Sequence, residues 1–403
     1  MTAKPNRTLP GSTDEAILHW LALRLTPGLG NRKAGQLIGV YRTPQAIFRA
    51  SKSELTAAGL SAAVAQSIAS GCAFDDAADQ QQKVAHAGVR IVTITDPAYP
   101  NLLKSIYDAP PILFALGRVE LLATVMLGVV GTRRPSAYGT QAATRLSKEL
   151  SLSGITIASG MARGIDTSAH KAVLEAGRDT VAVFGCGVDQ IYPAENRKLA
   201  EQLAKEGLII SEFPMEAPPY PQNFPIRNRI ISGMSVGVMV VEGSEYSGSA
   251  ITAKLASEQG REVFAIPGNI TSKMSWGPNL LIKQGAKLVQ EWNDVAAELS
   301  PETRRQLVAQ CRNRLKLNEN EPLASAAETN VDGFASTPSK AAQAVLQSLR
   351  TDAATGLDSL LDSLAGTVEG CSPSEIIAIL FDLELSGLVR QLPGKSYIRV
   401  WSS

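Results

Sequence analysis

The hydrophobic residues of this chain recur with different spacings in different regions, and each spacing predicts a different kind of structure. Between residue 14 and about residue 75 they repeat three and four positions apart, as in Ile17, Leu18 and Leu21, which predicts amphipathic helices. Two glycine-containing turns interrupt these helices, at residues 27–30 (PGLG) and 58–61 (AGLS). From about residue 88 to residue 300, short runs of β-branched residues alternate instead with segments of helix length.

These β-branched runs predict eight strands, at residues 89–94, 125–130, 155–158, 180–184, 208–211, 236–241, 262–266 and 287–289. Apolar strands separated by helices predict a doubly wound α/β domain, with a mostly parallel sheet covered on both faces. Right-handed crossovers place every strand-to-helix loop at one edge of such a sheet. Ligands bind beyond the carboxyl ends of the strands, so we expect function in those loops.

The C-terminal third has a third pattern. Residues 303–317 form a basic helical stretch, and residues 318–339 are rich in Ala, Ser, Thr, Asn and Pro without periodicity, which indicates a linker. Three helical segments at 341–349, 357–364 and 373–385 precede a hairpin pattern around 393–395, which together suggest a winged helix. We therefore expect four parts, at residues 1–80 (helical), 85–300 (doubly wound α/β), 301–339 (basic helix and linker) and 340–403 (winged-helix-like).

The composition is that of a globular protein with no strong overall charge. Of 403 residues, 44% are hydrophobic, and 39 basic residues nearly balance 38 acidic ones, so a polyanion would have to be held by local clusters of charge. Only 5% of residues are aromatic, which argues against a long row of stacking platforms. The four cysteines and three histidines are scattered, and no apolar run approaches a membrane span. We expect a soluble cytoplasmic protein without a metal, a cofactor or a membrane association.

Three predicted strand-to-helix loops are suited to phosphate groups. Each combines glycines, which allow close approach of the backbone, with a helix N-terminus, and arginines add donors in the first two loops. Their candidate residues are Gly131, Thr132, Arg133, Arg134, Ser159, Gly160, Arg163, Gly164, Gly248 and Ser249. None of the loops is a G-x-G-x-x-G fingerprint or a P-loop.

A fourth candidate segment, residues 223–229 (NFPIRNR), precedes a predicted helix at 230–234. Arg227 and Arg229 could hold a phosphate while Phe224 stacks on a base, with Asn228 between the arginines. A buried arginine–carboxylate network at the sheet edge would explain the same cluster. In the second loop, Asp166 or Thr167 is expected to be a helix N-cap and His170 to be structural, with a role as a base as the alternative.

Several motifs of this chain, taken together, resemble those of the DprA/Smf family of DNA-processing proteins. They are GTRRPSAYG at 131–139, SGMARGID at 159–166, IYP at 191–193 with Asn196, FPIRNRIISG at 224–233, GSAITA at 248–253 and GREVFAIPG at 260–268. The resemblance covers about residues 85–300, and the helical N-terminal part and the winged-helix-like C-terminal part fit the three-domain layout of the family.

The resemblance implies a function without catalysis and without catalytic residues. It implies that residues 85–300 are an extended Rossmann-like domain, which binds and protects single-stranded DNA with little sequence preference. It also implies loading of the RecA recombinase during natural transformation and a homodimer formed through the Rossmann-like domain. Arg133 would be a principal phosphate ligand, with Arg163, Phe224, Arg227, Asn228 and Arg229 in the same pocket. Some members carry a lysine before FPxRNR where this chain has Pro221 and Gln222; Lys254 or Lys283 could replace it.

Three questions stay open at this stage. A nucleotide-binding or nucleotide-hydrolysing enzyme of the lysine-decarboxylase-like group has a similar sheet, but the glutamate expected near residues 247–252 is missing until Glu258. A scaffold that recruits recombination proteins is the third alternative. The glycine hairpins of the N-terminal helices resemble helix-hairpin-helix or SAM-like domains, which bind DNA in some proteins and only pack in others.

The C-terminal block poses a separate question. Residues 340–403 hold five basic and seven acidic residues, and the candidate recognition helix at 374–386 has no lysine or arginine, which opposes phosphate binding. A protein contact or an autoinhibitory role is therefore favoured over a purely structural one. Arg390, Lys395 and Arg399 on the wing leave a weak DNA contact open.

Overall fold

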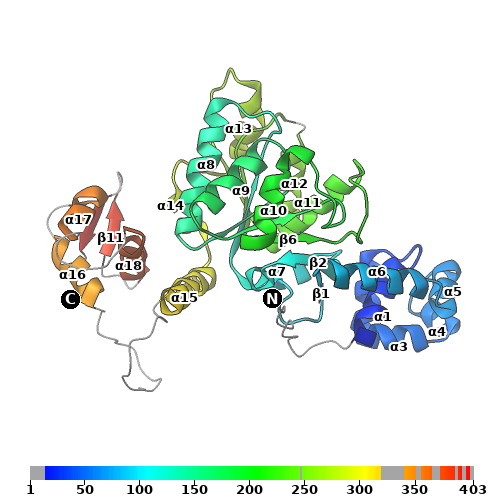
Figure 1. Ribbon diagram of the computed structural model, residues 1–403. Helices are drawn as coiled ribbons and strands as arrows, with labels where there is room; N and C mark the ends of the chain where they lie inside the picture. Colours follow the sequence, from blue (N-terminus) through cyan, green and yellow to red (C-terminus); the bar gives the residue numbers. More distant parts are fainter. Residues whose placement is uncertain are drawn as a thin grey trace, which may run out of the picture. The chain divides into compact units, whose positions relative to one another are not determined.

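The computed structural model describes residues 14–245, 247–318, 340–350, 355–364, 373–385, 389–392 and 396–399 (Figure 1). It divides into two compact units, residues 1–151 with 155–300 and residues 152–154 with 301–403. Within the described ranges, no helix combines the length and the apolar character needed to cross a membrane.

The first unit begins with six helices, which confirms the helical reading of the N-terminal region. They are α1 (Asp14–Leu25), α2 (Asn31–Tyr41), α3 (Pro44–Arg49), α4 (Lys52–Ala57), α5 (Ala62–Ser70) and α6 (Phe74–His86). Both expected glycine turns are present, and Gly28 and Gly59 have φ values of 76° and 89°, a region that favours glycine. Further breaks occur where Thr43 and Ser51 accept hydrogen bonds from the first turns of α3 and α4.

A nine-stranded sheet follows, in the order β1-β2-β6-β5-β4-β3-β7-β8-β9. All eight predicted strands are present, as β1 (Arg90–Thr93), β3 (Met126–Val130), β4 (Thr156–Ser159), β5 (Thr180–Val183), β6 (Leu208–Ser211), β7 (Gly237–Val240), β8 (Glu262–Ala265) and β9 (Lys287–Leu288). A further strand, β2 (Ile112–Gly117), was not predicted; it pairs antiparallel with both β1 and β6. From β6 across to β9 the strands are parallel, as expected for a doubly wound fold.

Helices connect the parallel strands, and both faces of the sheet are buried. The helices between the parallel strands are α8 (Ala137–Leu152), α9 (Ile165–Glu175), α10 (Arg197–Glu206), α11 (Asn223–Met234), α12 (Gly248–Glu258) and α13 (Trp276–Lys283). Helix α7 (Asn101–Lys104) lies between the antiparallel strands β1 and β2, and α14 (Trp292–Glu298) follows β9. Successive strand residues enter different hydrophobic clusters: Ile209 packs in one and Ile210 in the other. This alternation is the physical basis of the mostly parallel, two-sided sheet.

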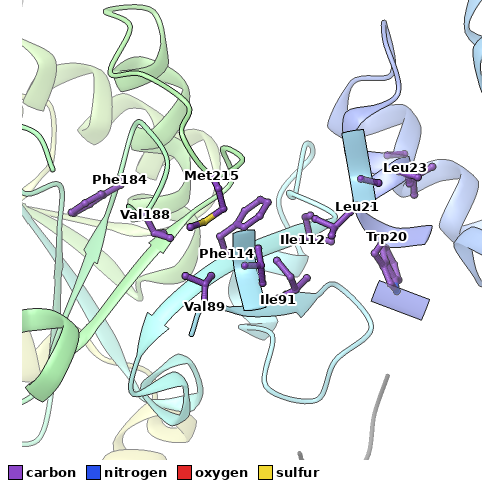
Figure 2. Close-up of a cluster of buried hydrophobic side chains, with 14 of the residues drawn as sticks. Trp20, Leu21, Leu23, Val89, Ile91, Ile112, Phe114, Phe184, Val188 and Met215 are labelled. Atoms are coloured by element: carbon purple, nitrogen blue, oxygen red, sulfur yellow. The ribbon is translucent and has the colours of Figure 1, made fainter. Parts of the chain in front are cut away.

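The N-terminal helices share a hydrophobic core with one face of the sheet. Trp20 and Leu21 of α1 belong to the same buried cluster as Ile112 and Phe114 of β2, the second strand of the sheet, and Met215, from the loop after β6, completes it (Figure 2). The helices and the sheet are therefore joined by apolar packing as well as by the chain, which explains why they form one compact unit.

The second unit contains α15 (Pro301–Asn318), α16 (Lys340–Ser348), α17 (Leu357–Leu364) and α18 (Pro373–Leu385), with a sheet in the order β10-β12-β11. The strands are β10 (Thr355–Gly356), β11 (Val389–Leu392) and β12 (Ser396–Arg399), all antiparallel. Val345, Leu360, Leu380 and Tyr397 are buried in its core. Three helices and a wing form the expected winged helix, and the short strand β10 is an addition. Residues 319–339 of the expected linker and the wing turn with Lys395 lie outside the described residues.

Candidate functional site

The sheet has a topological switch point at β3. From β3 the chain proceeds through β4, β5 and β6 on one side, and it returns to β7, β8 and β9 on the other. Open α/β sheets bind ligands beyond the carboxyl ends of the strands at such a point. A cavity of about 640 Å³ lies there, lined in part by Gly131, Thr132, Arg133, Arg134, Ala162, Asp166, Tyr192, Phe224, Arg227, Asn228, Ser247, Gly248, Ser249 and Thr252.

The loop after β3 presents Arg133 and Arg134 to solvent, and a buried glutamate holds this loop in place. The carboxylate of Glu242 accepts hydrogen bonds from the backbone N–H of Ser136 (2.8 Å) and from its hydroxyl (2.5 Å). The backbone oxygen of Glu242 accepts the N–H of Thr132 at 2.7 Å. Neither Arg133 nor Arg134 forms a salt bridge with any residue that the structure describes. Both guanidinium groups can therefore meet an anion without first leaving a carboxylate.

Two aromatic rings lie beside these arginines. The ring centroids of Tyr192 and Phe224 are 5.4 Å apart, and the guanidinium carbon of Arg133 lies 5.7 Å from the centroid of Phe224. Tyr192 is 37% exposed and Phe224 is partly buried, so the pair can be reached from solvent. An accessible ring next to an unpaired cation can receive a base and its phosphate together.

Arg227 forms a buried positive charge in the cavity wall. It is 4% exposed, and its Nη1 donates to the backbone oxygens of Gly160 (2.6 Å) and Val183 (2.5 Å). Burial lowers the pKa of Arg227 to about 10, against the attraction of the Asp166 carboxylate. Arg227 therefore stays charged at neutral pH in a place where water screens it poorly.

Asp166 holds the loop after β4, and both N-cap expectations in this loop were wrong. Helix α9 begins at Ile165, and its N-cap is Gly164, with a φ of 79°. The Asp166 carboxylate, inside the helix, accepts the N–H groups of Gly160 (3.1 Å) and Ala162 (3.3 Å), while the Thr167 hydroxyl donates to the Ala162 oxygen. Burial raises the pKa of Asp166 to about 6, and Arg227 opposes that rise.

His170 is buried in the protein interior, as expected for a structural residue. It is fully buried, and its Nδ1 lies 2.7 Å from the Thr180 hydroxyl oxygen. Burial lowers the pKa of His170 to about 3, so the ring is neutral at physiological pH. It does not line the cavity.

The loop before α12 forms the opposite wall. The Ser247 hydroxyl caps the helix by accepting the N–H of Ala250 (3.3 Å), and it lies 2.8 Å from the Ser249 hydroxyl. Asn228 donates to the backbone oxygen of Gly248 (3.4 Å), which joins this wall to α11, and the two helices pack against each other (Figure 1). This helix N-terminus lines the cavity and favours negative charge there.

Three of the expected phosphate ligands, Arg163, Arg229 and Lys254, do not line the cavity. Arg163 is exposed but is held by Glu195, with N–O distances of 2.9 to 3.1 Å, in a small pocket beside the cavity. Arg229 is buried away from the cavity, where it pairs with Asp108 (2.8 Å) and Glu212 (2.7 Å). Lys254 is 78% exposed beside Glu258 and, like Lys283, does not line the cavity. These positions do not favour direct phosphate contact by Arg229 or Lys254.

The helix boundary at this motif also differs from the expectation. Helix α11 begins at Asn223, so Phe224 and both arginines lie within it and not in a preceding loop. The sequence analysis also did not assign roles to Tyr192, Glu195 and Glu242. Tyr192 was part of a noted motif; the two glutamates act through distant partners and carry no local signal. Among the described residues, no group of acidic, histidine and cysteine side chains is arranged to hold a metal ion.

Comparisons with known proteins identify relatives of both units. Residues 90–300 match the family described as DNA recombination-mediator protein A, and residues 332–395 match the DprA winged helix domain. DNA processing protein DprA of Bacillus subtilis is 48% identical over 213 residues, 53% of this chain and 72% of that protein. Protein Smf of a Synechocystis species is 36% identical over 327 residues, 77% of this chain and 80% of that protein. The X-ray structure of DprA from Streptococcus pneumoniae superposes with a TM-score of 0.63 at 35% identity, covering 70% of this chain and 98% of that one.

Proposed function

Since this chain belongs to the DprA/Smf family of DNA-processing proteins, we propose that its switch-point cavity binds single-stranded DNA. The observation that carries the proposal is the pairing of an exposed, unpaired arginine with an accessible aromatic pair, Arg133 beside Phe224 and Tyr192. The arginine suits a phosphate and the rings suit a base.

The cavity favours a single strand over a duplex for a physical reason. A base can reach the Tyr192–Phe224 pair only when it is unpaired, and extracting a base from a duplex costs a few kcal/mol. Guanidinium groups, backbone N–H groups and ring faces read no base edges, so binding has little sequence preference. Bound strand within the cavity is shielded from solvent, which is the protective action that we propose.

Family membership supports a wider role. We propose that the chain, acting in the cytoplasm, helps to load the RecA recombinase onto the bound strand in DNA uptake and recombination, and that it forms a homodimer through the Rossmann-like unit. We also propose that it acts without catalysis. The cavity carboxylate among the described residues, Asp166, already accepts two backbone N–H groups, and Glu258 pairs with Lys254 away from the cavity. A nucleotide-hydrolysing enzyme would need a carboxylate free to act on the ligand.

The experiment is a fluorescence-anisotropy titration with a labelled single strand, a matched duplex and nucleoside monophosphates as competitors. We expect the single strand to bind more tightly than the duplex, and Arg133→Ala to weaken it about tenfold or more, because a hydrogen bond to a charged group is lost. Arg49→Ala is the matched control, since Arg49 is an exposed arginine of α3 outside the cavity. Displacement by a low concentration of mononucleotide, or equal effects of the two variants, would contradict the proposal.

A further inference from the structure

An arginine of the first glycine hairpin stacks on the most exposed aromatic side chain of the described residues. The guanidinium carbon of Arg32, at the start of α2, lies 4.4 Å from the ring centroid of Tyr107. Tyr107 is 72% exposed, in the turn that follows α7. Arg32 is exposed as well, and it forms no salt bridge within the described part of the chain.

This stack is connected to the cavity by a short series of buried contacts. Arg229 donates to Oε2 of the buried Glu212 at 2.7 Å, and Asn31, the neighbour of Arg32, donates to the same oxygen at 2.8 Å. Arg229 also pairs with Asp108, the neighbour of Tyr107, at 2.8 Å. The residues on both sides of the stack are therefore linked to Arg229, Asp108 directly and Asn31 through Glu212. Arg229 directly follows the cavity residue Asn228.

The same contacts hold the stack in a fixed position relative to α11. Glu212 is 1% exposed, and its backbone oxygen accepts a third donor, Nε of Arg24 in α1, at 3.2 Å. A buried carboxylate with several charged and polar donors cannot shift without exposing unpaired charge. The neighbours of Arg32 and Tyr107, Asn31 and Asp108, are thus both tied to α11 through Arg229.

We propose that Arg32 and Tyr107 form a second contact for the same DNA strand, in which a base stacks on Tyr107 and Arg32 meets the adjacent phosphate. The inference rests on the proposed function, because it needs a strand that leaves the cavity past α11. Proteins that bind single-stranded nucleic acid without sequence preference use exposed aromatic rings next to arginines. The alternative, an interdomain packing contact, would affect stability and not the dependence of affinity on strand length.

Strand length is the variable that distinguishes a second contact from a general loss of binding. We would measure affinity for an oligothymidylate of about 5 nucleotides, near the lower limit of the ~4–16 nucleotides of typical single-strand sites, and for one of about 20, beyond the upper limit. Tyr107→Ala should weaken the long strand at least about fivefold and leave the short one unchanged, whereas Tyr107→Phe should retain the wild-type affinity because it keeps the ring. Arg32→Ala should act like Tyr107→Ala, and the control Arg49→Ala should have no effect.

A photochemical readout locates the contact directly. An oligonucleotide with 5-iododeoxyuridine, irradiated in complex with the full chain, should cross-link to the peptide containing Tyr107 in wild type and lose that product in Tyr107→Ala. The inference would be overturned if Tyr107→Ala weakened the affinity for short and long strands equally. It would also be overturned if the affinity for both strands were unchanged and no cross-link formed. If the wild type binds neither strand, the proposed function itself fails; if Arg133→Ala weakens both strands and Tyr107→Ala neither, only the second contact fails.

Discussion

Gly160→Ala is a small change that the structure expects to be costly, because the space for a methyl group is already filled. The three atoms closest to a Cβ at this position all belong to the Arg227 guanidinium and would overlap it. Gly160 is not in the left-handed region, so the backbone itself tolerates alanine. The methyl group must therefore displace the guanidinium from the backbone oxygens of Gly160 and Val183.

The cost follows from those two hydrogen bonds. Each hydrogen bond from a charged donor contributes about 1.5–3 kcal/mol, so losing both destabilises the protein by about 3 kcal/mol or more. Alanine also restricts the unfolded chain, which offsets about 0.4–1 kcal/mol. We expect a net loss of about 2 kcal/mol or more in the free energy of unfolding by urea. Single-strand affinity should fall too, because Arg227 lies 5.9 Å from the Phe224 ring.

A double-mutant cycle tests the cause. In an Arg227→Ala background the methyl group has room, so Gly160→Ala should no longer destabilise the protein and should keep only the gain of about 0.4–1 kcal/mol from the restricted unfolded chain. The coupling energy should therefore be about 3 kcal/mol or more. Gly39→Ala is the control, because a Cβ there meets nothing within 4 Å in the exposed interior of α2, and it should stabilise by up to about 1 kcal/mol. Equal costs of Gly160→Ala in both backgrounds would refute the steric argument.

Three further predictions follow from charges at and near the cavity. If Arg133 and Arg134 each neutralise one phosphate, the slope of log affinity against log salt concentration is about −1.4. The affinity should then fall about sevenfold between 50 and 200 mM salt. Arg133→Ala should reduce the magnitude of this slope by about 0.7 in anisotropy titrations. Because burial raises the pKa of Asp166 to about 6, its contribution to stability is present below about pH 4 and is lost as the pH rises through 6. Asp166→Asn should remove that change, about 3 kcal/mol, in urea unfolding measured from pH 4 to 7. Arg229→Met should cost about 3–5 kcal/mol in the same assay, because it leaves the Glu212 carboxylate buried without its cation, and adding Glu212→Gln should restore part of the loss.

Each of these has an outcome that contradicts it. A salt slope that does not change in Arg133→Ala would place the phosphates elsewhere. A difference between wild type and Asp166→Asn that is constant from pH 4 to 7 would mean that the carboxyl group titrates normally. Full additivity of the Arg229 and Glu212 substitutions would show that the two side chains do not depend on each other.

The elements that could be predicted from the sequence are those with a local signal. Apolar β-branched runs between helix-length segments identified the parallel strands, and glycines at their carboxyl ends identified the loops that line the cavity. Strand β2 was missed because its apolar run directly follows Pro110 and Pro111, which look like the start of a loop. Its place beside β6, 91 residues later at the Gly117–Leu208 pair, depends on pairing that no local pattern contains.

The carboxylates that bind residues of the site could not be predicted either, because they lie far from their partners in sequence. The exposure of Arg133 could be inferred from its loop, but Glu195, which holds Arg163, lies 32 residues away in sequence. Glu242, which holds the loop after β3, lies 106 residues from Ser136. Ion pairs and hydrogen bonds of this kind depend on the folded sheet edge, so their effect on each arginine becomes visible only in the structure.

The two arginines of the FPIRNR segment lie in different places, with only Arg229 in a buried arginine–carboxylate network, and helix geometry explains why. In a helix, positions two residues apart are separated by about 200°, so Arg227 and Arg229 of α11 must point in nearly opposite directions. Arg227 faces the loop after β4 and the cavity, and Arg229 faces Glu212, where the N-terminal helices meet the sheet. One helix turn therefore carries both a charge for the cavity wall and the anchor for the first glycine hairpin. A strand held at the cavity and a strand held at Tyr107 would be aligned by this same turn, so a change at Arg229 should disturb DNA binding without any contact between Arg229 and DNA.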